Sequence, residues 1–363
     1  MDWDVYCRVV DNHGDLGVCW RLCADLASRN ERVRLWVDDA GALAWMAPLG
    51  APGVRVHQWP DVQGKAEVTP GHAVIAAFGC ELPHRVLAAM AAAQPPPVWI
   101  NLEYLSAEDY VERSHGLPSL HSTGPAAGLT QWFFYPGYAD ATGGLLREPD
   151  LAARQSAFDR SAWLASKGIE SPERETIVSL FCYAPHPAFG ALLDALDAQG
   201  GGNSTLLLAA PDAATDLLRE HLGSGLARGR LRGVALPWLS QLDYDHLLWA
   251  SDLNIVRGED SWVRAQWAGR PFVWQAYAQH DGAHRAKLDA FLDRFLTDAP
   301  DSVARALRAA SMRWNGLHDG ALLLPPIDEW RTHAARWRDG LACRPDLTTQ
   351  LIGFVEQHTT ASR

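Results

Sequence analysis

The sequence predicts an α/β fold with two domains, each built around a parallel sheet. Short apolar runs of strand length alternate with helical patterns along most of the 363 residues. This rhythm is typical of parallel strands joined by right-handed crossovers. The chain is also longer than a single small core requires. Between Gly143 and Pro172 the composition changes, with turn-forming segments such as GG, EPD and SPE. This change predicts that the chain passes from one domain to the other here.

The first alternating series predicts helices over Val18–Ser28 and Pro83–Ala93. Its expected strands are Val5–Val9, Val33–Val37, Val54–Gln58, Val74–Phe78, Val98–Leu102 and Trp132–Tyr135. The second series predicts strands over Ile177–Cys182, Thr205–Ala209, Leu231–Leu236, Leu253–Val256 and Pro271–Trp274. Ligands of such sheets bind beyond the carboxyl ends of the strands. We therefore expect function in the loops that follow Val10, Leu102, Cys182 and Val256.

Composition narrows the function classes. The net charge is 32 − 43 = −11 and no run of Lys or Arg offsets it, which disfavours binding to a nucleic-acid backbone. No stretch of eighteen apolar residues predicts a transmembrane helix. The first residues carry acidic groups where a signal peptide needs basic ones, so we expect a cytoplasmic protein without a membrane partner. The six cysteines form no CxxC motif, and we expect them to be reduced and to bind no metal.

The loop after the first strand carries two carboxylates. Asp11 and Asp15 lie beside Gly14 and Gly17, which allow tight backbone geometry where a helix opens. A dinucleotide-binding fold would place GxGxxG here to receive a phosphate. Two negative charges instead favour a cation, and they can hold and deprotonate a nucleophile. The alternative is that these residues only cap the helix.

A second polar loop, Arg257–Ser261, follows the strand that ends near Val256. Asp260 or Ser261 can cap the following helix, and Gly258 and Glu259 complete the turn. The N–H groups at the start of a helix form an anion site, which suits a diphosphate without a metal. The alternative is an ordinary capped turn.

Aromatic residues form a third group in predicted loops. Rings beside a hydrogen-bonding amide suit a planar base, although each ring taken singly is more often part of a core. The group comprises Phe181, Tyr183, Trp238, Tyr244 and Tyr277, with the amide of Gln241 among them.

Several motifs together resemble one family. DNHGDLGVCWRL near the N-terminus, FFYPGY at Phe133–Tyr138, TGGLLRE at Thr142–Glu148 and LLWASDLNIVRGEDSWVRAQWAGRPFVW in the second half are similar to the EarP arginine rhamnosyltransferases that modify translation elongation factor P. The resemblance implies a GT-B glycosyltransferase with two Rossmann-like domains facing across a cleft. We expect an acceptor domain over residues 1–172 and a nucleotide-sugar domain over 173–347. A terminal helix, at about 348–363, is expected to pack back on the first domain.

The resemblance also implies the chemistry. It predicts inverting transfer of L-rhamnose from dTDP-β-L-rhamnose to an arginine of elongation factor P, a modification that activates the factor for rescue of ribosomes stalled at polyproline. It implies no cofactor and no metal. The family's catalytic acids match Asp11, Asp15 and Glu259. Its donor contacts match Tyr183, Trp238, Gln241, Tyr244, Asp260, Ser261 and Tyr277. The chain departs from the family pattern at Trp238 and Tyr244, usually Phe, and at His13, usually Tyr.

Other functions share part of this pattern. A GT-B sugar-nucleotide transferase with a small-molecule acceptor would have the same fold and donor site, and it remains the alternative. An NAD-dependent dehydrogenase is disfavoured because GxGxxG is missing from the first loop. A non-catalytic binding module would not need three acids in one site.

Overall fold

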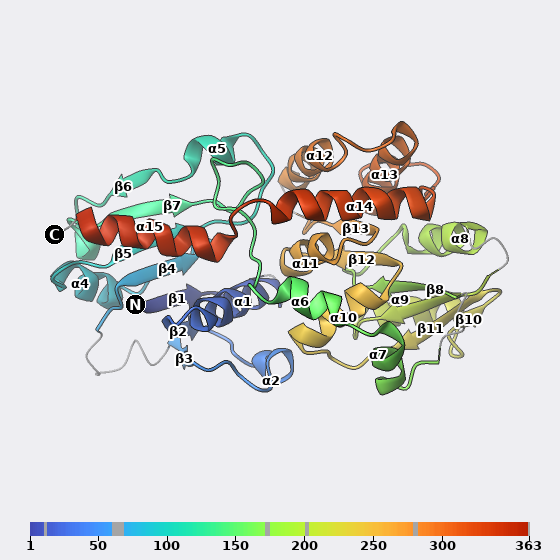
Figure 1. Ribbon diagram of the computed structural model, residues 1–363, viewed down its shortest axis with the longest axis horizontal. Coiled ribbons are helices and arrows are strands. Elements are labelled where there is room, and N and C mark those ends of the chain that lie inside the picture. Colours follow the sequence, from blue (N-terminus) through green and yellow to red (C-terminus); the bar gives the residue numbers. More distant parts are fainter. Residues whose placement is uncertain (11–12, 60–68, 171–174, 200–202, 279–281, 362–363) are drawn as a thin grey trace. The chain divides into compact units, whose positions relative to one another are not determined.

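The computed structural model describes residues 1–10, 13–59, 69–170, 175–199, 203–278 and 282–361 (Figure 1). The chain divides into two compact units. Unit 1 consists of Met1–Pro149 and Cys343–Arg363, and unit 2 of Asp150–Ala342.

Unit 1 contains a seven-stranded sheet in the order β3-β2-β1-β4-β5-β7-β6. All neighbouring pairs are parallel except β6 and β7, which are antiparallel. The strands are β1 (Asp2–Cys7), β2 (Arg32–Val37), β3 (Val54–Gln58), β4 (Ala73–Ala77), β5 (Val98–Leu102), β6 (Pro118–Leu120) and β7 (Thr130–Phe134). The helices are α1 (Gly14–Ser28), α2 (Leu43–Met46), α4 (His84–Ala92), α5 (Tyr110–Ser114) and α15 (Leu347–Ala361), with a 3₁₀ turn η1 at Gly124–Ala126.

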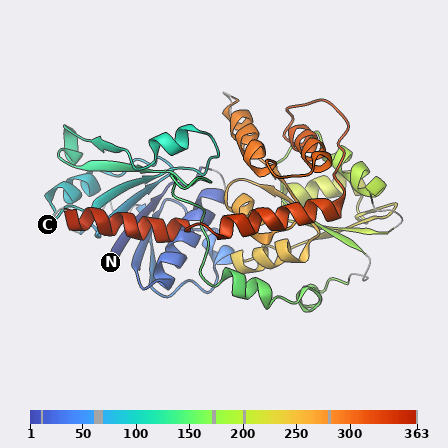
Figure 2. The same cartoon turned by 45° about the horizontal axis from the view of Figure 1, so that its top comes forward.

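The central strands of unit 1 are buried on both faces. β4 (AVIAA) and β5 (VWINL) contain no exposed residue, as expected for parallel strands covered by helices on both sides. Side chains of α1 and α15 share one core with β1, β4 and β5, and α15 runs along this face of the sheet (Figure 2). The other face packs against α4 and η1.

Unit 2 contains a six-stranded sheet in the order β10-β11-β9-β8-β12-β13. The strands are β8 (Thr176–Leu180), β9 (Thr205–Ala209), β10 (Ala227–Arg228), β11 (Leu231–Ala235), β12 (Leu253–Arg257) and β13 (Phe272–Gln275). Only the short β10 is antiparallel to its neighbour among these described strands. The helices are α6 (Leu151–Ser156), α7 (Arg160–Ser166), α8 (Phe189–Gln199), α9 (Ala213–Leu222), α10 (Gln241–Ala250), α11 (Asp260–Ala268), α12 (Ala283–Phe295), α13 (Asp301–Trp314) and α14 (Ile327–Ala342).

Both sheets have a point where the strand order reverses. In unit 1 the chain builds outward from β1 through β2 and then returns to place β4 on the other side of β1. In unit 2 the corresponding neighbours are β8 and β12. Loops that leave such neighbours diverge to opposite faces and leave room for a ligand at the carboxyl edge. The loops after β1, β4, β8 and β12 are therefore the places to look for function.

The unit boundaries differ from the expected division at residue 172. Unit 2 begins at Asp150 because α6 and α7 pack with it. Trp163, Leu164 and Ile169 share a core with the β9 residues Leu206 and Leu208. Near the C-terminus the chain re-enters unit 1 at Cys343, a few residues before the expected boundary at 347.

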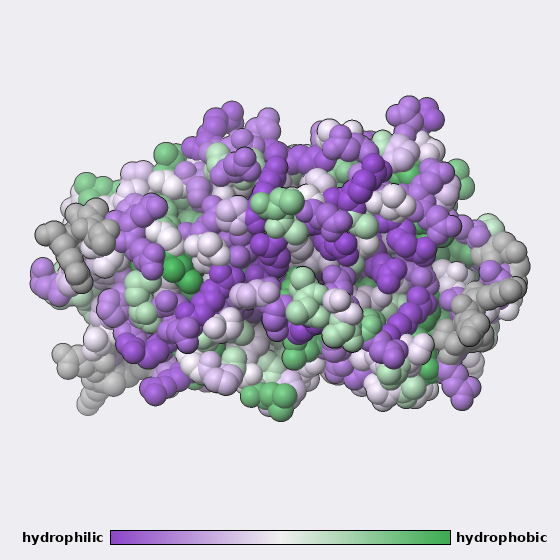
Figure 3. Space-filling model, viewed as in Figure 1, coloured by the Kyte–Doolittle hydropathy of each residue, from purple (hydrophilic) through white to green (hydrophobic). Residues whose placement is uncertain are grey.

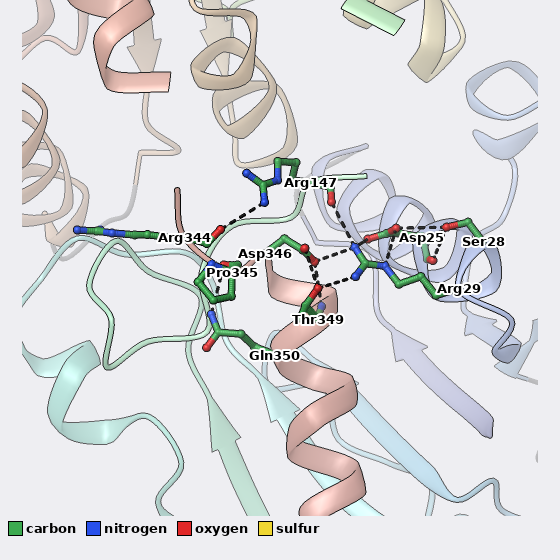
Figure 4. Close-up of polar contacts among 9 residues, drawn as sticks. All are labelled: Asp25, Ser28, Arg29, Arg147, Arg344, Pro345, Asp346, Thr349 and Gln350. Carbon is green, nitrogen blue, oxygen red and sulfur yellow. Dashed lines mark hydrogen bonds and ion pairs between the residues drawn. The ribbon is translucent and has the colours of Figure 1, made fainter. Parts of the chain in front are cut away.

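Polar contacts tie the C-terminal segment to α1 within unit 1 (Figure 4). The guanidinium of Arg29, the C-cap residue of α1, donates to Asp25 of that helix, to Asp346 at 2.8 Å and to Thr349 at 2.6 Å. The backbone at Gly144 also packs closely against the C-terminal segment, because a Cβ on Gly144 would lie 2.5 Å from the carbonyl oxygen of Pro345. The side chains of α15, from Leu347 onward, thus complete the core of unit 1.

On the face drawn in Figure 3, hydrophobic residues are scattered among hydrophilic ones. Across the described residues, no helix combines the length and the apolar character needed to span a bilayer.

Candidate active site

Asp15 is a buried carboxylate at the carboxyl edge of the sheet in unit 1. It lies in the first turn of α1 and is 2% exposed. The backbone N–H of Val10 donates to Oδ2 at 2.9 Å, and the hydroxyl of Tyr104 donates to Oδ1 at 3.0 Å. The start of a helix also favours a negative charge. The carboxylate is therefore held from both sides, at the point where the strand order reverses.

The other predicted residues of this loop differ in what the structure shows. Asp11 lies outside the described residues. Gly14 begins α1, and the N–H of Gly17 donates to the carbonyl oxygen of His13 at 2.9 Å. His13 precedes the helix and its ring meets Trp45 edge-on, with the centroids 5.2 Å apart. His13 therefore packs against Trp45 at the start of α1.

Tyr104 was not singled out from the sequence, although the loop after Leu102 was. It follows β5 by two residues, and its ring stacks on Phe78 with centroids 4.2 Å apart and planes 10° from parallel. Phe78 comes directly after β4, has a φ of +58°, and its N–H donates to the carbonyl oxygen of Leu102 at 2.7 Å. Three loops at the carboxyl edge, after β1, β4 and β5, therefore meet at Asp15.

In unit 2, β12 passes into α11 through a tight turn. Gly258 adopts a φ of +64°, a left-handed conformation that glycine takes without strain. Glu259, rather than Asp260 or Ser261, is the N-cap residue, so the expected cap is wrong in its position. Ser261 uses its hydroxyl within the turn instead: it donates to the carbonyl oxygen of Arg257 and accepts from the N–H of Arg257 at 3.2 Å.

Glu259, the third predicted acid, belongs to unit 2. Its Oε2 lies 3.8 Å from Nζ of Lys287 on α12. Lys287 also lies 6.0 Å from the ring centroid of Trp262, whose side chain is fully buried in α11. The turn between β12 and α11 therefore carries a carboxylate next to a cation.

Arg257 joins the aromatic residues of the predicted donor site. Its guanidinium carbon lies 4.3 Å from the ring centroid of Phe181 and 4.4 Å from that of Tyr183. Within the described part of unit 2, no carboxylate pairs with it. The cation is held by two rings, which is a favourable cation–π arrangement, at the point where the strand order of this sheet reverses. Sequence reasoning placed Arg257 in the polar turn without giving it a role.

The predicted aromatic residues converge around this cation. Tyr183 meets Tyr277 edge-on at 5.5 Å, and its N–H donates to Oε1 of Gln275 at 2.8 Å. Phe181 meets Tyr244 edge-on at 5.9 Å. The rings come from the loops after β8 and β13 and from α10, so this part of the predicted donor set lies together.

Two further donor-site candidates lie at the start of α10. Trp238 is half-buried in the loop before the helix, and Gln241 is the first helical residue and is buried. Ser240 caps the helix, since its hydroxyl accepts from the N–H of Asp243 at 3.2 Å. The amide of Gln241 is thereby fixed at the end of a capped helix.

A buried ion pair joins the two helices that carry the donor candidates. Arg264 of α11 donates to Asp245 of α10 at 2.9 and 2.7 Å, and each side chain is 1% exposed. Arg154 of α6 reaches the same carboxylate at 3.4 Å. The pair fixes α10, which begins at Gln241, against α11, which begins at Asp260.

The acidic and thiol groups of the described residues do not assemble a metal site. Among those residues, no group of three or more His, Cys, Asp and Glu side chains is arranged to hold a metal ion. Cys19 and Cys23 are buried within α1. A hydrogen bond with the Cys7 thiol, and then burial, raise the pKa of Cys19 well above its ordinary value, and burial does the same for the pKa of Cys23. They fit the expected role of small core residues.

Known proteins resemble this chain along nearly its whole length. The family model described as Elongation-Factor P (EF-P) rhamnosyltransferase EarP matches residues 3–356. A protein-arginine rhamnosyltransferase of Pseudomonas aeruginosa is 42% identical, over 97% of this chain and 98% of that protein. One of Shewanella oneidensis is 33% identical, over 98% of both chains.

Solved structures give the same result for the fold. The structure that explains EarP-mediated arginine glycosylation of translation elongation factor EF-P superposes with a TM-score of 0.67 at 31% identity, covering 98% of this chain and 99% of that one. The spinosyn rhamnosyltransferase SpnG complexed with thymidine diphosphate reaches a TM-score of 0.51 at 12% identity, covering 98% and 100%. The fold is that of the GT-B glycosyltransferases.

Proposed function

The chain belongs to the EarP family of elongation factor P rhamnosyltransferases, and on that premise we propose that it transfers L-rhamnose from dTDP-β-L-rhamnose to an arginine side chain of elongation factor P. Among the structural observations, the cation–π cluster of Arg257, Phe181 and Tyr183 beside the start of α11 carries the proposal. An arginine next to a helix N-terminus suits a diphosphate. The rings nearby suit a nucleobase.

Different residues of this cluster bind different groups of the nucleotide-sugar donor. Arg257 and the N–H groups at the start of α11 bind the diphosphate, with Ser261 and Asp260 in the same turn. The amide of Gln241 hydrogen-bonds the thymine, and the aromatic side chains of Tyr183, Trp238, Tyr244 and Tyr277 flank the nucleoside. Trp238 and Tyr244 keep an aromatic ring where the family usually has Phe, so stacking is retained. Arg257 and the helix supply positive potential without a metal, so no metal takes part in the reaction.

The energetics of the acceptor require a concerted proton transfer. A guanidinium has a pKa above 12 and a carboxylic acid one near 4, so complete transfer before attack would cost roughly 11 kcal/mol at about 1.4 kcal/mol per pK unit. Asp15 therefore accepts the proton while the bond forms. As the nitrogen bonds to the anomeric carbon it leaves the guanidinium delocalisation, and its proton becomes more acidic. Asp11 and Glu259 hold the positively charged acceptor.

The donor side of the reaction balances this step. The bond between the anomeric carbon and the diphosphate oxygen breaks through an oxocarbenium-like state. The nitrogen attacks from the opposite face, so the β-linked donor gives an α-linked product. Arg257 and the start of α11 stabilise the charge that develops on the leaving diphosphate.

Intact-mass analysis tests the function directly. Purified protein is incubated with dTDP-β-L-rhamnose and elongation factor P, and a mass increase of one deoxyhexose on the factor is expected. Fragmentation locates the sugar on arginine, and NMR of the product gives its anomeric configuration. A matched reaction uses elongation factor P with that arginine replaced by lysine, which should remain unmodified. Donor consumption with an unmodified factor would instead support a small-molecule acceptor.

A further inference from the structure

We propose that Tyr104 and Phe78 form a positioning device that orients Asp15 for proton transfer. The inference deepens the proposed function and rests on it, because it takes Asp15 as the base. Neither Tyr104 nor Phe78 was assigned a role by the motif pattern. Their arrangement comes entirely from the carboxyl edge of the sheet in unit 1.

The hydroxyl of Tyr104 fixes one oxygen of the base. It donates to Asp15 Oδ1 at 3.0 Å while the N–H of Val10 donates to Oδ2 at 2.9 Å. A carboxylate with one donor can still turn about its last torsion, whereas one donor on each oxygen holds the plane of the group. A base must keep its accepting lone pair within hydrogen-bond reach of the proton it takes. Fixing the plane of the carboxylate should therefore raise the rate of proton transfer, since small misplacements of a catalytic group lower its effective molarity.

Phe78 in turn fixes the ring of Tyr104. The two rings stack with centroids 4.2 Å apart and planes 10° from parallel. Phe78 lies between β4 and Gly79, and the N–H of Phe78 anchors it to Leu102, two residues before Tyr104. The ring of Tyr104 therefore rests on a neighbour fixed to the same strand end.

The backbone of Phe78 supports a role beyond packing. Its φ of +58° lies in the left-handed region, which an aromatic residue adopts only at a conformational cost. Gly79 follows it with a φ of +68°, so glycine is used at the next position in the same turn. A phenylalanine at the first of these positions retains strain that a glycine would remove. Residues held in this way concentrate at functional sites, and here the ring's contact is the residue that holds Asp15.

Single-turnover kinetics with elongation factor P and saturating donor test this chain of contacts. Tyr104→Phe keeps the stacked ring and removes only the hydroxyl. We expect the rate to fall roughly ten- to hundredfold, the scale of a hydrogen bond to a charged group. Donor affinity measured by calorimetry should not change, because the donor residues belong to unit 2. Tyr110→Phe is the matched control: Tyr110 is an exposed tyrosine of the same unit, and the variant should react as wild type does.

A double-mutant cycle separates positioning from a general structural effect. If Tyr104 acts through Asp15, Tyr104→Phe should lower the rate in the wild-type background and have no further effect in the Asp15→Asn background. Phe78→Leu should lower the rate by a smaller factor, and Phe78→Tyr, which restores a ring, should recover it. All variants are compared by thermal unfolding, and melting temperatures close to wild type are expected for Tyr104→Phe.

The outcomes distinguish this inference from the function on which it rests. A wild-type protein that leaves elongation factor P unmodified would overturn both. An Asp15→Asn variant with normal turnover would leave the transfer activity standing and would overturn the assignment of Asp15 as base together with the positioning role. Inactive Asp15→Asn together with a Tyr104→Phe variant of wild-type rate would overturn the positioning role alone. So would losses that multiply in the double variant, because a residue acting independently of Asp15 gives that result.

Discussion

The buried pair between Arg264 and Asp245 should be the most sensitive ionic contact in unit 2. Replacing Arg264 with methionine removes the closest cation from the Asp245 carboxylate, which is 1% exposed, and leaves it in contact with Arg154 at 3.4 Å. Breaking a buried pair from one side costs about 3–5 kcal/mol, and Arg154 offsets part of this loss. We therefore expect a loss of about 3 kcal/mol in the free energy of unfolding, at the lower end of that range.

The size of unit 2 converts this loss into a melting shift. The unit spans residues 150–342, which is 342 − 150 + 1 = 193 residues. At about 2–4 °C per kcal/mol for a domain of this size, the transition of unit 2 should move down by roughly 6–12 °C. Differential scanning calorimetry measures the shift. Donor affinity should also fall, because the pair sets the spacing between the helices that begin at Gln241 and Asp260.

Two control variants test whether the melting shift comes from an uncompensated buried charge. Arg219→Met removes a guanidinium whose side chain is 58% exposed and paired with Asp216 on the surface, and it should leave the melting temperature nearly unchanged. Asp245→Leu combined with Arg264→Met removes both charges and should recover most of the lost stability. An Arg264→Met variant that melts like Arg219→Met would refute the reasoning, because no uncompensated buried charge would then be present.

Three further predictions concern the donor, metal ions and pH. Gln241→Ala and Ser261→Ala should each weaken calorimetric binding of dTDP, and unchanged affinity in both variants would remove the proposed donor site. Transfer to elongation factor P should persist in excess EDTA; activity lost there and restored by magnesium or manganese would contradict a metal-independent diphosphate site. His186 is 5% exposed and stacks on Trp314 at 3.6 Å, and burial lowers its pKa to about 4. Because the unfolded chain then binds the proton more tightly, unfolding free energy should fall by about 3 kcal/mol as pH drops from 6.5 to 4. The melting temperature of wild type relative to His186→Phe should decline over that interval, and a constant difference would contradict the assignment.

The strands could be predicted from the sequence because buried parallel strands are continuous apolar runs. Val54–Gln58, Val98–Leu102 and Thr205–Ala209 match the observed β3, β5 and β9 residue for residue. Ends were less accurate: β1 spans Asp2–Cys7 rather than Val5–Val9. The short antiparallel β6 and β10 were missed, since two or three residues at a sheet edge carry no periodic signal.

The candidate site could be predicted only in part, because it depends on contacts between loops that are distant in the sequence. Loops could be predicted from the ends of strands, which gave the positions around Asp15 and Ser261. Contacts between loops could not, because Tyr104 lies 89 positions from its partner Asp15. Nothing local marks Tyr104 as a hydrogen-bond donor to a carboxylate. The same holds for Arg257, whose position over Phe181 and Tyr183 depends on the pairing of β8 with β12.

The return of the chain to unit 1 has a consequence for how the protein is made. Unit 2 is one continuous segment, Asp150–Ala342, and is complete as soon as that segment has left the ribosome. Unit 1 begins first but lacks part of its core until Leu347, Leu351 and Val355 of α15 arrive. Although domains commonly fold in order from the N-terminus during synthesis, here a segment translated after unit 2 closes the first unit. The nascent N-terminal sheet therefore keeps part of one apolar face uncovered, beside α1, throughout the synthesis of the second unit.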